Sequence, residues 1–173
     1  IWAFDQSESM KDDQKEIRAN FHKVYEELGL VTEKDKEVQG RGRDVLLTAI
    51  MSFGATDHRM TQRPTADINA IRHAIDRITV DDTGAENLCL AVEETIDEYR
   101  SFAQNGKRRV IVIVVSDESG DDGQRVDEAI AKARRYNMPV YTLGREAIFG
   151  YPFARIRWKD PIFGLDHWLP ITR

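Results

Sequence analysis

Three short segments of the chain combine carboxylates with hydroxyls at places where chemistry is expected. The apolar residues 1–4 are followed directly by Asp5-Gln6-Ser7-Glu8-Ser9, and the apolar residues 110–115 by Ser116-Asp117-Glu118-Ser119-Gly120-Asp121-Asp122. A third cluster, Asp81-Asp82-Thr83, precedes a predicted helix. The three segments contain neither His nor Cys, so every side-chain donor in them is a hard oxygen atom. Such donors suit Mg²⁺, Mn²⁺ or Ca²⁺, and not zinc or copper.

The spacing of Asp5, Ser7 and Ser9 is suited to a single cation. In an extended turn every second side chain points to the same side, so one carboxylate and two hydroxyls converge on one ion. Because hydroxyls are neutral ligands, most of the charge of such an ion is left unneutralised. The ion is therefore expected to accept a further carboxylate from an acidic partner side chain.

The elements that must position these segments follow from the changing period of the apolar residues. Short apolar or β-branched runs alternate along the chain with segments in which apolar residues recur every three or four positions. The predicted strands are residues 1–4, 45–53, 110–115 and 139–143, with a further edge strand within residues 57–65. The predicted helices begin near residues 12, 68, 84 and 126. This alternation predicts an α/β fold with a mostly parallel central sheet flanked by helices. The run at 110–115 has no alternation, which is typical of a strand covered on both faces. Open parallel sheets bind ligands at the carboxyl ends of their strands, so the three polar segments are expected to meet.

With this order of elements, Asp5-Gln6-Ser7-Glu8-Ser9-Met10 after an apolar strand resembles the DxSxS metal-ion-dependent adhesion site of the von Willebrand factor A domain family. The resemblance covers residues 1–144 and implies a three-layer, Rossmann-like fold. It also implies that Ser7 and Ser9 bind the ion directly and that Asp5 and Asp117 act largely through water. Thr83 is the nearest match to the threonine that the family supplies from a third loop.

The same resemblance implies a function. Members of the family bind protein ligands through the metal without catalysis, so we expect a binding module and not an enzyme. The expected cation is Mg²⁺, with Mn²⁺ or Ca²⁺ as alternatives, and the expected partner is a protein with an exposed Asp or Glu. The habit of the family favours an extracytoplasmic location, periplasmic or at the cell surface, with the cytoplasm as the alternative.

The chain departs from the family pattern in the third loop. Counted back from Leu88, Thr83 lies about one residue later than usual, and Asp82 occupies the expected position. Either of the two side chains is therefore a candidate to face the metal. Thr83-Gly84-Ala85-Glu86 is also a capping-box pattern, so an alternative role for Thr83 is to cap the helix that follows. For Asp121 and Asp122 we expect a role at the start of the helix after Gly123 and not in metal binding.

The last residues differ in character from the rest. We divide the chain into a von Willebrand factor A-like domain at residues 1–146 and an aromatic-rich C-terminal β extension at residues 147–173 that packs on the same domain. Residues 155–158 and 166–169 are expected to form a long-looped hairpin. This extension either covers an apolar face or edge of the sheet, or binds a partner.

Composition limits the classes of partner. The 173 residues contain 25 Lys and Arg against 30 Asp and Glu, which gives a formal net charge of −5 at pH 7. An acidic balance predicts no nucleic-acid partner. The longest apolar run, at 110–115, is far shorter than the roughly 20 residues that span a bilayer, so no direct membrane insertion is expected. Cys89 is the one cysteine, which excludes an internal disulfide. Because the sequence opens with Ile1 inside a predicted strand, we expect a domain of a longer or processed protein.

Two other functions remain alternatives. A metal-dependent phosphoryl hydrolase would use Asp5 and Asp117 on a similar sheet, but the residue two positions after Asp5 is Ser7, which cannot act as the acid that such enzymes often place there. A scaffold module would keep an idle metal site and bind its partner through residues 147–173.

Overall fold

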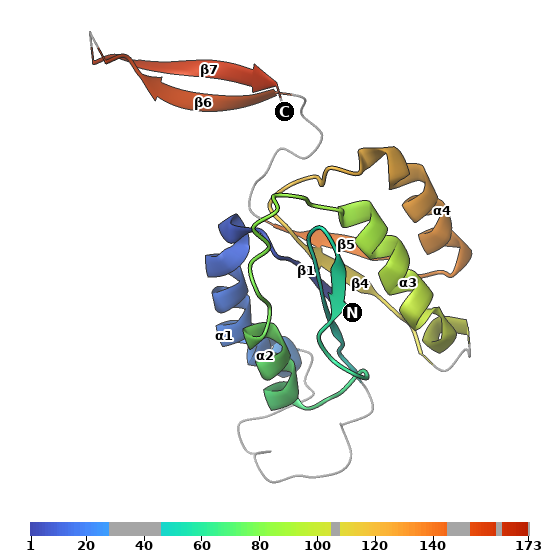
Figure 1. Ribbon diagram of the computed structural model, residues 1–173. Helices are drawn as coiled ribbons and strands as arrows, with labels where there is room; N and C mark the ends of the chain where they lie inside the picture. Colours follow the sequence, from blue (N-terminus) through green and yellow to red (C-terminus); the bar gives the residue numbers. More distant parts are fainter. Residues whose placement is uncertain (28–45, 105–107, 145–152, 162–163, 173) are drawn as a thin grey trace.

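The computed structural model describes residues 1–27, 46–104, 108–144, 153–161 and 164–172. Its main sheet has five strands in the order β3-β2-β1-β4-β5 (Figure 1). Their bounds are Trp2–Asp5 for β1, Ile50–Phe53 for β2, Asp57–Arg59 for β3, Val112–Val115 for β4 and Val140–Leu143 for β5. β1 pairs in parallel with β2 and β4, and β4 pairs in parallel with β5, whereas β3 is antiparallel to β2. The predicted mostly parallel sheet is therefore confirmed, with the short edge strand at 57–59.

Within the described residues, four α-helices cover the two faces of this sheet. Figure 1 shows α1 (Lys11–Glu27) and α2 (Ile68–Asp76) on one face, and α3 (Leu88–Gln104) and α4 (Val126–Arg135) on the other. The buried residues form two separate clusters, as a sheet between two helical layers requires. One contains Phe4, Phe21, Ile50 and Ile71, and the other contains Ala3, Phe53, Ile96 and Val112. The predicted three-layer α/β architecture is confirmed.

Strand β1 shows how the sequence creates two cores. Consecutive side chains of a strand point to opposite faces, and Ala3 and Phe4 belong to different clusters. Phe4 packs with the α1 residue Phe21, and both are almost fully buried. Burying an aromatic side chain of this size contributes about 1.5–3 kcal/mol. The strand that carries Asp5 at its end is thus held from both sides.

Two predicted features differ in the structure. The third helix, α3, begins at Leu88 and not near Gly84, because the preceding residues are hydrogen-bonded to other loops. The prediction that residues 110–115 are covered on both faces is wrong at Ile111, which is 39% exposed. Gly29, a residue type that often ends a helix, lies outside the described residues.

The C-terminal residues form the predicted hairpin. β6 (Phe153–Lys159) and β7 (Asp166–Thr172) pair antiparallel in a two-stranded sheet of their own. The chain reaches it through residues 145–152, which the structure does not describe, so the packing of this extension on the domain stays a prediction. Trp158 and Leu169 are 43% and 41% exposed.

None of the helices in the described residues is long and apolar enough to span a bilayer.

Candidate metal site

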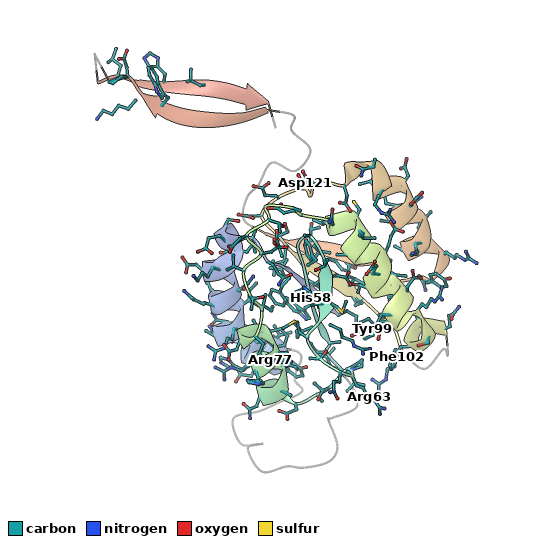
Figure 2. All side chains as sticks on the ribbon, viewed as in Figure 1. His58, Arg63, Arg77, Tyr99, Phe102 and Asp121 are labelled. Carbon is teal, nitrogen blue, oxygen red and sulfur yellow. The ribbon has the colours of Figure 1, made fainter. Side chains whose placement is uncertain are left out.

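The candidate site lies where two neighbouring parallel strands end. β1 and β4 are adjacent, with Phe4 opposite Val115, so the segments that follow them leave the sheet side by side. Asp5 ends β1, and Ser116 and Asp117 come directly after β4. Figure 2 shows Asp121, from the segment after β4, at this end of the sheet, and Arg63 and Phe102 toward the opposite end. The predicted meeting of these two segments is therefore observed.

Four of the five predicted site residues form one hydrogen-bonded chain. The hydroxyl oxygens of Ser7 and Ser9 are 3.0 Å apart, and the Ser9 hydroxyl donates to Oδ1 of Asp117 at 3.2 Å. The backbone N–H of Ser7 donates to Oδ1 of Asp5 at 2.7 Å. Ser7 and Asp117 are half-buried and Ser9 is exposed, so a group from solvent can reach these oxygens.

Asp5 is the buried anchor of the site. Its side chain is fully buried and its second oxygen, Oδ2, accepts a hydrogen bond from the Ser116 hydroxyl at 2.8 Å. Gln14 of α1 donates to the Asp5 carbonyl at 2.6 Å. A buried carboxylate is tolerated when its oxygens have donors, and here the donors come from the segments after both strands. Asp5 thereby fixes the turn that presents Ser7 and Ser9.

These four residues fit a hard divalent cation. Their side chains supply two carboxylates and two hydroxyls, which is an all-oxygen donor set of the kind that Mg²⁺, Mn²⁺ and Ca²⁺ prefer. Within the described ranges, no three side chains of His, Cys, Asp or Glu are grouped closely enough to hold a metal ion. A metal here would therefore depend on the hydroxyls of Ser7 and Ser9 as well as on carboxylates.

Thr83 has a different set of contacts from the other four. Its backbone N–H donates to Oδ1 of Asp81 at 2.9 Å, and its hydroxyl accepts from the N–H of Ala85 at 3.3 Å. Hydrogen bonds from the Thr83 side chain and from the backbone N–H of Ala55 and Thr83 hold the pKa of Asp81 below its usual range. Asp82 is exposed. The role of either Thr83 or Asp82 at the metal stays a prediction.

The capping-box prediction for Thr83 is wrong, because α3 begins at Leu88. Its first turn is instead capped by Asp122, from a segment more than 30 residues away in sequence. The Asp122 carboxylate accepts from the N–H of Cys89 at 2.9 Å and from the N–H of Leu90 at 2.7 Å. The predicted role of Asp121 and Asp122 at the start of the helix after Gly123 is only partly observed. Asp122 is the N-cap residue of the 3₁₀ helix Gly123–Arg125, and its carbonyl accepts from the N–H of Arg125 at 2.9 Å. The carboxylates of both residues instead bind the backbone of residues 86–90.

Glu86 is a charged neighbour of the site that the sequence pattern assigned only to a capping box. Burial and the negative charges of Asp5, Glu118, Asp121 and Asp117, in decreasing order, raise its pKa to about 7. The signal for Glu86 in the sequence is that it is an acidic residue in the loop that leads into a helix at this end of the sheet. The family pattern does not single out Glu86, because Thr83 matches that pattern more closely.

Gly144 allows the end of β5 to pack tightly against the site. A Cβ atom at this position would lie 2.1 Å from the carbonyl oxygen of Ser116, whose hydroxyl holds Asp5. Any side chain here would push apart the ends of β4 and β5. The glycine therefore contributes to the position of the residues after β4.

Comparisons with known proteins agree with the fold. The family model described as von Willebrand factor type A domain matches residues 1–151. Among solved structures, proximal thread matrix protein 1 from the mussel byssus is similar in fold, with a TM-score of 0.51 and 15% sequence identity. The similarity covers 86% of this chain but 36% of the mussel chain, so this chain spans about a third of that protein. A comparison with curated proteins gives no match.

Proposed function

The chain belongs to the von Willebrand factor type A domain family, and on this premise we propose that it is a protein-binding module with a divalent-cation site formed by Asp5, Ser7, Ser9 and Asp117. Domains of this family generally mediate protein–protein interactions. The finer proposal is that a partner is bound through the cation by an exposed carboxylate.

The observation that supports the proposal is the continuous hydrogen-bonded chain of oxygen donors at one sheet end. Asp5 bonds to the N–H of Ser7, the Ser7 hydroxyl contacts Ser9, and Ser9 donates to Asp117. These residues come from two segments more than 100 positions apart in sequence. A fold that brings hydroxyls and carboxylates together at an accessible surface supplies the ligands that a hard cation needs.

Each residue has a distinct task in this proposal. Ser7 and Ser9 provide neutral oxygen ligands, and Asp117 orients the Ser9 hydroxyl through their hydrogen bond. Asp5 is too deeply buried to meet a partner and sets the conformation of the turn. When bound, Mg²⁺ supplies a positively charged coordination position that can accept a carboxylate oxygen of the partner.

The phosphoryl-hydrolase alternative receives less support. Phosphoryl transfer on metal ions generally uses several carboxylate ligands or two metals. Among the described residues no group of three or more acidic, His or Cys side chains is arranged to hold an ion, and the residue two positions after Asp5 is Ser7, whose hydroxyl contacts Ser9. We therefore propose binding without catalysis.

Calorimetric titration with Mg²⁺ and Mn²⁺ tests the proposal. Ser7→Ala should weaken binding of either cation at least tenfold, because it removes a direct ligand. Ser101→Ala, an exposed position on α3, is the matched control and should bind as the unmodified chain does. Equal affinity of the unmodified chain and Ser7→Ala would refute the proposed site.

The idle-site alternative is tested on the same material. If partner binding depends on the cation, a peptide with a single Glu should bind to the Mn²⁺-loaded chain and its Gln counterpart should not. If binding of a partner persists in Ser7→Ala but is lost when residues 147–173 are removed, the extension is the interface and the metal site is idle.

A further inference from the structure

The segment of residues 81–87 crosses the end of the sheet and connects to three other loops. The N–H of Asp81 donates to the carbonyl of Gln6 at 2.9 Å, and the N–H of Asn87 donates to the carbonyl of Gly54 at 3.2 Å. The first half of the segment turns upon itself, because the Asp81 carboxylate accepts a hydrogen bond from the N–H of Thr83. The same carboxylate accepts a hydrogen bond from the N–H of Ala55, which follows β2. Thr83 is thereby engaged on the β2 side of the site.

The second half of the segment is fixed to the loop that carries Asp117. The N–H of Glu86 donates to the Asp121 carboxylate at 3.0 Å, and the N–H of Asp121 donates back to the Glu86 carbonyl at 2.8 Å. Gly120 has a φ of +79°, and a Cβ atom there would lie 3.0 Å from the Glu86 carbonyl. This close packing leaves the backbone of Glu86 few alternative positions. Glu86 is thereby held on the β4 side of the sheet end.

The Glu86 side chain lies within the field of the candidate ligands. It is half-buried, and the charges that raise its pKa include those of Asp5 and Asp117. The ion pairs of the described residues do not include Glu86. Carboxylates that repel one another at one place are stabilised by a cation bound among them.

We propose that Glu86 is the charged residue that the third loop contributes to the cation site, and that it strengthens divalent-cation binding from outside the ligand shell. This inference rests on the proposed function. A role outside the ligand shell agrees with the finding that the described residues contain no group of three carboxylate, His or Cys side chains placed to hold one ion. A single negative charge about 6 Å from a divalent cation in a water-like medium changes its affinity by about tenfold.

The test is Mn²⁺ titration followed by calorimetry and by the electron paramagnetic resonance signal of free Mn²⁺, at about pH 8. Glu86→Gln keeps the size of the side chain and removes its charge. Glu26→Gln, exposed in the last turn of α1, is the matched control for the loss of one charge. Glu86→Asp retains the charge. Thermal unfolding without metal identifies any variant that fails to fold, and Glu86→Ala, which also removes the charge, then takes the place of a failed Glu86→Gln.

The proposal expects about tenfold weaker Mn²⁺ binding for Glu86→Gln, near-normal binding for Glu86→Asp, and no change for Glu26→Gln. The number of water molecules on bound Mn²⁺ should stay the same in Glu86→Gln, because no direct ligand is lost. Equal or tighter binding by Glu86→Gln, or an equal loss in Glu26→Gln, would overturn it. If Ser7→Ala abolishes binding while Glu86→Gln does not weaken it, this inference fails and the proposed function stands. A chain that binds no Mn²⁺ refutes both.

Discussion

Replacing Asp122 with alanine is expected to lower the free energy of unfolding by about 3 kcal/mol, because it removes two hydrogen bonds to a charged group. Asp122 is 4% exposed, and its carboxylate accepts from the N–H groups of Cys89 and Leu90 in the first turn of α3. These N–H groups have no partner within their own helix, since the first turn of any helix lacks carbonyl acceptors. The substitution therefore removes the acceptor of two donors at once.

The magnitude follows from these two hydrogen bonds. A hydrogen bond to a charged group contributes about 1.5–3 kcal/mol, and replacing a helix-capping side chain by alanine costs about 0.5–2 kcal/mol. Water can enter and accept hydrogen bonds from the N–H groups that lose their acceptor. The expected loss of unfolding free energy is therefore about 3 kcal/mol, which is less than the full contribution of both hydrogen bonds. For a chain of this length, that change lowers the melting temperature by about 6–12 °C.

Urea unfolding followed by circular dichroism measures the effect, with two further variants as controls. Asp122→Asn keeps one acceptor oxygen and should lose about half as much. Asp121→Ala removes a neighbouring exposed carboxylate that accepts one backbone hydrogen bond, from Glu86, and should lose less than about 1 kcal/mol. A loss below about 1 kcal/mol for Asp122→Ala, or equal losses at both positions, would show that Asp122 is not the cap of α3.

Three other predictions follow from the same geometry. Gly144→Ala should lower the melting temperature and weaken Mn²⁺ binding together, because its Cβ would lie 2.1 Å from the Ser116 carbonyl; a normal melting temperature would contradict the close packing. Without metal, the chain should lose about 1–2 kcal/mol of stability relative to Glu86→Gln as the pH rises from 4.5 to about 7. The reason is that the pKa of Glu86 is raised in the folded state, and the loss is limited because the partly exposed charge is screened by water. Unfolding free energies of the two proteins that stay parallel across this pH range would contradict the prediction. Tyr25→Phe should cost about 1 kcal/mol in urea unfolding, because the buried Tyr25 hydroxyl bonds to Thr48 at 2.8 Å; no loss would show that this bond does not stabilise the fold.

The arrangement of Asp5, Ser7, Ser9 and Asp117 could be predicted because it depends on strong, regular signals. Apolar runs before Asp5 and before Ser116 identify the two strands, and the parallel order of an α/β sheet brings their carboxyl ends to one edge. Alternation within β1 further separates Ala3 from Phe4 into two cores. These relations involve whole elements, so an error of one or two residues in an element bound does not change them.

The third loop could not be predicted, because it is held by contacts that leave no local pattern. The sequence of residues 83–86 matches a capping box, but the carboxylate that caps α3 is that of Asp122, which is 33 residues away from Cys89. Asn87 is held from the opposite side, where its side-chain amide donates to the carbonyl of Ala55 at 3.0 Å. Contacts between distant segments thus set the start of α3 and the position of Glu86.

A crystal of the chain soaked with Mn²⁺ provides the most direct test of the central claim. Anomalous scattering of manganese locates the ion without any assumption about its ligands. The proposed site predicts one strong peak next to the hydroxyl oxygens of Ser7 and Ser9, between the segments that follow β1 and β4. A peak elsewhere, or no peak beside these two serines under conditions in which calorimetry shows binding, would contradict the claim that this sheet end is the cation site.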